Sequence, residues 1–237
     1  MNTRIMRKIP AVVLLTALLL AGAYRADAAP VGFPIVPLRT GQYSATLEGR
    51  WGERDLIDKN TNFQERTEVA AVEGKFGYGF TDRIGGYIHL GGSELTVDRL
   101  SFDGDWGLSV GLGLKGVLLT TPGGWRFCAD GQYRFFESED TGNHRADWDE
   151  FQVAATVSQD IEFITPYIGA VWSYNTIEQE LSFKPDDQFG LVAGLDYRLM
   201  PNLTLALEGR LVHETSVSLG LTYTFDHWPW WPSPDEF

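Results

Sequence analysis

Cysteine is nearly missing from this chain. Its 237 residues include one, Cys128, so no intramolecular disulfide can form. Basic residues are also few: 19 Lys and Arg against 32 Asp and Glu give a formal charge of -13. That balance argues against nucleic acid or anionic lipid as a general partner. Long apolar runs are limited to residues 11–23, and no other stretch is long and apolar enough for a membrane helix.

The first 28 residues have the organisation of a secretory signal peptide. A basic start precedes the apolar run 11–23, and Ala26-Asp27-Ala28 supplies a small-x-small cleavage site. We therefore expect residues 1–28 to be removed, which leaves Ala29 as the new N-terminus. The alternative is an uncleaved anchor, for which the run is short.

Residues 41–225 are dominated by alternation with a period of two, which is typical of strands with two unlike faces. In residues 216–225, large apolar side chains face one side, and serine, glycine and threonine face the other. Ten such segments follow one another, at about 43–52, 69–80, 84–95, 106–119, 125–136, 151–161, 166–177, 189–199, 203–212 and 216–225.

Connections after the even-numbered segments are short, whereas most of those after the odd-numbered segments are long. This alternation is typical of a membrane barrel with periplasmic turns and outer loops. The predicted fold class is all-β: an antiparallel up-and-down transmembrane β-barrel of about ten strands, with eight as the alternative and both termini in the periplasm. A soluble periplasmic binding barrel, with the two faces exchanged, is the competing interpretation.

If the leucine and aromatic face meets lipid, the opposite face lines the lumen. That face carries acids and bases, several at i and i+2 on one strand, which would pair across strands and offset their desolvation. The predicted lumen charge network contains Glu48, Arg50, Glu73, Lys75, His89, Lys115, Arg126, Asp130, Arg134, Asp196, Arg198, Glu208 and Arg210.

The predicted long loops hold most of the net charge, with twenty acids against six bases. One interpretation is solvation of the outer surface. The other is a rim that attracts cations or bridges divalent ions to lipopolysaccharide phosphates, because hard cations bind carboxylate oxygens.

Two segments rich in proline flank the barrel. Residues 29–40 contain three prolines, which exclude a helix or a central strand, so we expect an extended periplasmic lead-in. Residues 226–237 combine three prolines with three tryptophans. We expect a periplasmic tail there, either resting at the membrane interface or docking a periplasmic partner.

The signal peptide, the series of hairpins and the last alternating strand resemble Gram-negative outer-membrane β-barrel proteins of the small OmpA, OmpX and OmpW class. The resemblance is one of pattern and covers nearly the whole chain after residue 28. It implies an outer-membrane location, contact with lipids and lipopolysaccharide, and delivery by the barrel assembly machinery. The assembly signal it implies comprises Leu219, Leu221, Tyr223 and Phe225. Here Phe225 is followed by twelve further residues, unlike a terminal signal.

Two classes of outer-membrane enzyme offer alternative interpretations. Omptin proteases have acids and an Asp/His pair at the outer mouth, and Asp103-Gly104-Asp105 loosely resembles their acidic pair. A lipid A deacylase needs a His/Ser/Glu triad on the lipid-facing wall. His213, Glu214 and Ser216 do not have the spacing of that family.

No spacing of metal ligands is present, and no cofactor is expected. The predicted function is non-enzymatic: a structural or surface-interaction barrel, or a narrow cation-preferring pore. The alternatives are an outer-membrane hydrolase or a soluble binding barrel.

Overall fold

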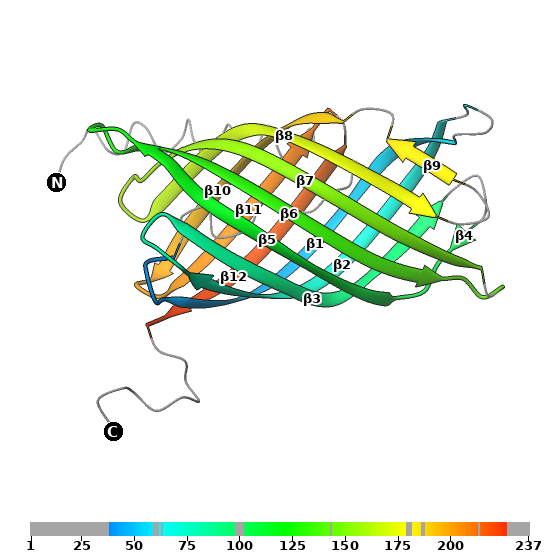
Figure 1. Cartoon of the computed structure of the whole chain (residues 1–237), viewed down its shortest axis with the longest axis horizontal. Helices are drawn as coiled ribbons and strands as arrows, with labels where there is room; N and C mark the ends of the chain where they lie inside the picture. The colour runs from blue at the N-terminus through cyan, green and yellow to red at the C-terminus, as the bar shows by residue number, and fades with distance from the viewer. Residues whose placement is uncertain are drawn as a thin grey trace, which may run out of the picture.

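The computed structural model of the protein is a β-barrel whose strands run obliquely around it (Figure 1). The structure describes residues 38–58, 62, 64–97, 102–142, 144–178, 182–185, 188–212 and 214–226. Ten long strands build it: β1 (Tyr43–Asp58), β2 (Gln64–Gly79), β3 (Ile84–Val97), β5 (Gly107–Thr120), β6 (Trp125–Glu139), β7 (Arg145–Gln159), β8 (Ile164–Glu178), β10 (Phe189–Met200), β11 (Leu203–Leu211) and β12 (Thr215–Phe225). Two short strands are added, β4 (Phe102–Asp103) and β9 (Ser182–Pro185).

Among the described residues there is no helix with the length and apolar character needed to span a membrane.

Each long strand pairs with its neighbours in antiparallel fashion, and the ladder closes on itself. β12 returns to β1, in register from Tyr43 opposite Phe225 to Glu53 opposite Thr215. β10 pairs directly with β8, which completes a ring of ten. The predicted ten-stranded antiparallel barrel is confirmed, and the eight-stranded alternative is wrong for the body of the barrel.

The outside of the barrel is a belt of apolar side chains. Leu47, Ile88, Leu112 and Ile168 are each more than half exposed, and aromatic rings such as Trp125 lie toward the ends. The opposite positions on the same strands are buried and mostly polar. Such a belt would be unstable in water but suits the hydrocarbon of a bilayer. The structure is therefore a transmembrane barrel, and the soluble alternative is wrong.

We name the two ends of the barrel by their connections. The short-turn end carries the turns at 80–83, 121–124, 160–163 and 201–202, and both ends of the described chain. There Gln42 Nε2 donates to Asp226 Oδ1 at 2.8 Å, so the start of β1 is tied to the residue after β12. The other end is the long-loop end.

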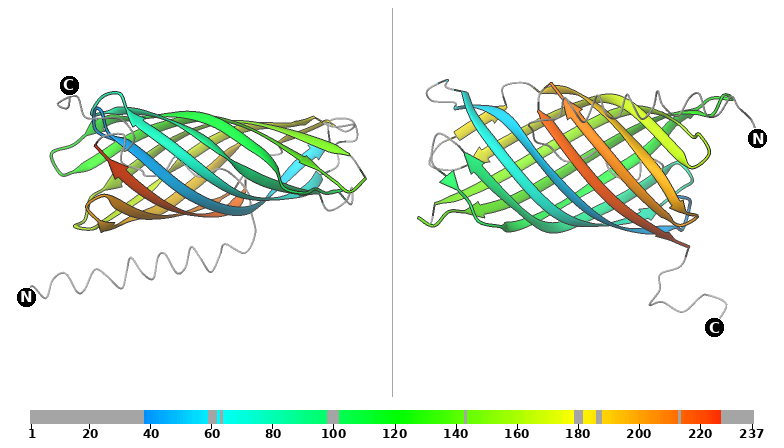
Figure 2. Two further views of the ribbon diagram at one scale, coloured as in Figure 1. Left: turned by 90° about the horizontal axis from the view of Figure 1, so that it is seen from below. Right: turned by 180° about the vertical axis from the view of Figure 1, so that it is seen from behind.

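At the long-loop end the barrel narrows from ten strands to eight, because β10, β11 and β12 stop early. Figure 2 shows these orange and red strands ending short of the blue and cyan β1 and β2. Beyond them β9 bridges the gap, pairing with β8 at Ile177 opposite Phe183 and with β1 at Ile57 opposite Lys184. β4 pairs with β3, and Gly104 bridges to Asp140 just beyond β6. We call β1, β2, β3, β4, β6, β7, β8 and β9 the narrow ring.

The strands at this end are longer than the sequence indicated. β1 continues to Asp58 instead of ending near residue 52, and β7 begins at Arg145 instead of near residue 151. Above the apolar belt both faces of a strand can be polar, so the lipid-facing alternation ends while the hydrogen-bonded ladder continues. Residues assigned to long loops therefore belong to strands.

The predicted signal peptide (1–28), most of the lead-in (29–40), His213 and all of the tail (226–237) except Asp226 lie outside the described residues.

Candidate functional site: the filled lumen

Most of the predicted lumen charges lie where the alternation places them. Eleven of the thirteen are inside the barrel and at most 6% exposed: Glu48, Arg50, Glu73, Lys75, His89, Lys115, Asp130, Arg134, Asp196, Glu208 and Arg210. Arg126 and Arg198 are not buried. Arg126 forms an ion pair with Asp160 in the turn between β7 and β8, and Arg198 is exposed near the end of β10. At the short-turn end a side chain that points inward can still reach water. Alternation along the strand therefore does not by itself predict that such a residue is buried.

Glu73 on β2 is a focus of the lumen charges. Its Oε1 accepts a hydrogen bond from Ser109 Oγ at 2.5 Å, and its Oε2 lies 3.2 Å from His89 Nδ1. Arg134 Nη1 approaches Glu73 from β6 at 3.5 Å. One carboxylate thus joins β2 to β3, β5 and β6, which offsets the cost of removing it from water.

The contacts continue from Arg134 across the barrel. Arg134 binds Glu150 on β7 at 2.5 Å, and Arg54 Nη1 lies 3.9 Å from both Glu150 and Glu214. Arg210 then lies 3.4 Å from Glu214 and 2.9 Å from Glu208. Acids and bases alternate along this path, which we call the lumen network.

Neutral side chains complete the network. Tyr167 donates to Glu208 at 2.8 Å, and Arg210 Nη1 donates to the amide oxygen of Gln152 at 2.6 Å. Nearer the short-turn end, Lys75 pairs with Glu48 at 2.6 Å, and Tyr87 donates to Asp130 at 3.0 Å. The lumen is therefore crossed by side chains from most of the ten strands.

Three members of the network fall in segments that the sequence predicts to be loops. These are Arg54, Glu150 and Glu214, yet each is at most 3% exposed inside the barrel. The alternation of β1 and β7 continues beyond the last lipid-facing residue. Extending it by a few residues would have predicted that Arg54 and Glu150 point inward. Glu214 and Ser216 face the lumen as well, so they do not form a triad on the lipid-facing wall.

An apolar cluster lies inside the narrow ring, beyond the network. Phe136 and Trp148 stack with ring centroids 5.3 Å apart, and both are 3% exposed or less. The cluster contains Leu56, Val69, Leu95, Val97, Phe102, Phe136, Ala146 and Trp148. An eight-stranded ring has an interior about as wide as its side chains can fill. We call this cluster the apolar cap; it lies at the long-loop end, beyond the lumen network.

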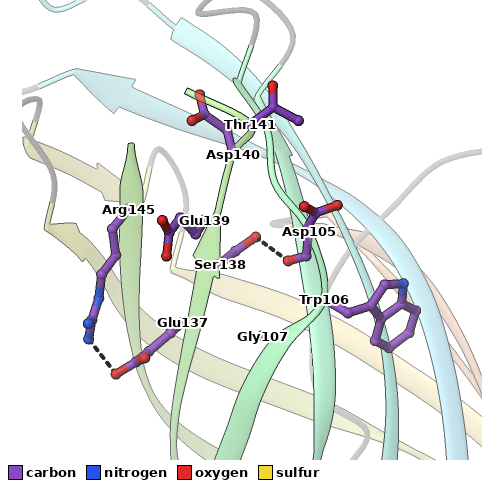
Figure 3. Close-up of a pocket in the computed structure, with 9 residues that line it drawn as sticks. All are labelled: Asp105, Trp106, Gly107, Glu137, Ser138, Glu139, Asp140, Thr141 and Arg145. Carbon is purple, nitrogen blue, oxygen red and sulfur yellow. Dashed lines mark hydrogen bonds and ion pairs between the residues drawn. The ribbon is translucent and has the colours of Figure 1, made fainter. Parts of the chain in front are cut away.

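Outside the cap, the rim carries an acidic cleft of about 440 Å³ between the start of β5 and the β6–β7 hairpin (Figure 3). Asp105, Glu137, Glu139 and Asp140 line it, and Arg145 at its edge pairs with Glu137. In the predicted pair, Asp103 and Asp105 are both exposed.

Asp140 stabilises the turn between β6 and β7. It accepts hydrogen bonds from the backbone N–H groups of Gly142 and His144, both at 2.8 Å, and lies 2.9 Å from His144 Nδ1. The hydrogen bonds from His144 lower the pKa of Asp140. The contact between this acid and histidine is thus explained by the turn.

No protein-family model and no curated protein matches the sequence. Several solved structures are similar to this chain at low identity. An outer membrane channel from Pseudomonas putida F1 matches with 11% identity and a TM-score of 0.49, over 84% of this chain and 100% of the channel. OprG from Pseudomonas aeruginosa matches with 12% identity and a TM-score of 0.38, over 81% and 99%. Neisserial surface protein A matches with 13% identity and a TM-score of 0.36, over 79% and 98%.

The closed ladder, the apolar belt and the polar interior define the chain as a transmembrane β-barrel of the kind found in outer membranes.

Proposed function

We propose that this protein is a closed, non-enzymatic outer-membrane barrel that acts through its surface and does not conduct as folded. The observation that carries the proposal is the apolar cap above the lumen network. A water-filled pore needs a continuous polar path, whereas here an apolar cluster follows a layer of paired charges. Outer-membrane barrels have short periplasmic turns and longer outer loops, so we further propose that the short-turn end faces the periplasm and the acidic rim faces the cell surface.

The expected partners follow from this orientation. The apolar belt contacts lipid, and the acidic rim lies near lipopolysaccharide phosphates, which divalent cations would bridge. Outward-facing Leu219, Leu221 and Tyr223, with Phe225 at the end of β12, remain the predicted signal for the assembly machinery. The tail after Phe225 remains a candidate docking peptide for a periplasmic partner.

The test is a planar-bilayer recording of the refolded full chain, with a known porin as the control for insertion. We expect no stepwise conductance from this protein when the porin inserts normally. Heat-modifiable migration on a gel would establish beforehand that the barrel is folded.

The second candidate is a narrow cation-preferring pore, which the acidic cleft at the rim favours. It predicts stable unitary steps and a reversal potential displaced toward that of the cation in a salt gradient. Such steps from the unaltered chain would refute the closed barrel.

A further inference from the structure

The hydrogen-bonded ladder is interrupted on one side of the barrel, at the level where ten strands give way to eight. β8 pairs with β10 up to Trp172 and with β9 only from Ile177 onward. β1 pairs with β12 up to Glu53 and with β9 only from Leu56 onward. In these two short intervals, each strand has a strand partner on one side only, as far as the described residues extend. Strand pairing therefore does not close the wall at this level.

Glu214 lies at this interruption. It directly precedes β12, and its side chain is buried inside the barrel. Glu214 Oε1 lies 3.4 Å from Arg210 Nη1 on β11, and its Oε2 lies 3.9 Å from Arg54 Nη1, in the one-sided interval of β1. Ser216 Oγ donates a further hydrogen bond to Glu214 at 3.4 Å. One carboxylate therefore ties the β11–β12 hairpin to a part of β1 that the ladder leaves open.

The connection between β11 and β12 is strained at Val212. This residue has a φ of 91°, and its side chain is 68% exposed. A positive φ is unfavourable for a branched side chain, whereas glycine adopts it at little cost. Because Val212 is exposed, burial offsets little of this strain. The ion pairs of Glu214, two residues further along the chain, provide an interaction inside the barrel that can hold the strained conformation in place.

Buried polar groups in the one-sided interval of β8 lack partners. Ser173 Oγ and both polar side-chain atoms of Asn175 have no hydrogen bond within the described part of the chain. Both residues are at most 1% exposed. Their cross-strand neighbours on β7 are Gln152 and Glu150, which are both part of the lumen network. A buried polar group without a partner costs free energy, which an opening that admits water would recover.

We propose that Glu214 is a latch at the side of the barrel. Its ion pairs hold the wall shut at the interrupted ladder, and their loss lets water reach the lumen network there, while the strands below and the narrow ring above stay paired. Three costs of the closed arrangement meet at this place: the one-sided strands, the strain at Val212 and the buried polar atoms without partners. The latch goes beyond the proposed function, because it concerns how the wall opens and holds whether or not the resting barrel conducts.

The test measures access to the lumen beside the latch with a buried cysteine. In a Cys128→Ala background, Ser173→Cys is reacted with a charged thiol reagent in the refolded full chain. We expect Glu214→Gln to speed labelling at least about tenfold, because protection follows the free energy of local opening. Ser158→Cys is the reference, since Ser158 is also buried, on β7 near the short-turn end. Its labelling rate should not change.

Two further variants distinguish a latch from a general loss of stability. Val212→Gly should slow labelling at Ser173→Cys about threefold or more, because it relieves strain that only the closed arrangement carries. Asp55→Asn removes an exposed acid from the one-sided interval of β1 and should leave the rate unchanged. Equal acceleration of Ser173→Cys and Ser158→Cys by Glu214→Gln would show that the whole barrel loosens, which overturns the proposal. A labelling rate at Ser173→Cys that is unaffected by either Glu214→Gln or Val212→Gly overturns it as well.

Discussion

Single buried charges in this barrel are held by several partners at once. Glu73 is the clearest case, since it contacts Ser109, His89 and Arg134 from three other strands. A buried ion pair adds little net stability, but removing one partner leaves the other desolvated and uncompensated. The lumen network therefore restricts which substitutions the interior tolerates.

We expect Glu73→Gln to lower the free energy of unfolding by about 3 kcal/mol, because Arg134 would keep its burial and lose a charge partner. The measurement is urea-induced unfolding in lipid vesicles. Glu68→Gln is the matched control on the same strand, because Glu68 lies on the outward face, opposite Glu53. A surface substitution of that kind should change stability by about 0.5 kcal/mol or less. Equal effects of the two substitutions would contradict the network.

At the scale of elements, the change from ten strands to eight divides the barrel into two parts. The body is enclosed by lipid outside and by paired charges inside. The narrow ring continues above the apolar belt, and the apolar cap forms its interior. Burial of this apolar cluster therefore contributes to the stability of that end.

Trp148→Ala tests this division. Removal of the buried indole should cost about 3–5 kcal/mol at the long-loop end. We expect faster hydrogen exchange in residues 53–58 and earlier proteolysis in the β6–β7 hairpin, with exchange in β11 unchanged. Phe151→Ala is the control, since Phe151 lies on the same strand but faces outward. Uniformly faster exchange in all strands would show that the two parts unfold together.

The strands in the body of the barrel could be predicted from the sequence, whereas their continuation at the long-loop end could not, for one physical reason. Lipid enforces alternation, so residues such as Leu112 and Lys115 could be assigned to opposite faces correctly. Above the lipid that constraint ends, and the continuation of β1 to Asp58 has no lipid-facing pattern. The pairing of Arg54 with Glu150 and Glu214 depends on the relative stagger of distant strands, which alternation does not specify.

On the scale of the whole molecule, the two faces of one continuous sheet meet two different media. Outward side chains on β5 such as Leu108, Leu112, Leu114 and Leu118 are more than half exposed, whereas inward Lys115 is buried. The net charge of -13 belongs mainly to parts of the chain outside the belt, such as the acidic rim. Position relative to the bilayer therefore determines what each residue can be replaced by.

This dependence on depth gives the last prediction. Leu112 is near the middle of β5, and Leu118 is close to the turn at 121–124. An arginine facing lipid costs about 2–4 kcal/mol at the middle of the bilayer and about 0–1 kcal/mol near its edge. We expect Leu112→Arg to lower the free energy of unfolding in vesicles by the larger of these amounts and Leu118→Arg to lower it by the smaller. Both side chains are similarly exposed, so a soluble barrel would tolerate the two substitutions equally. Equal and small effects would therefore contradict a membrane-embedded belt.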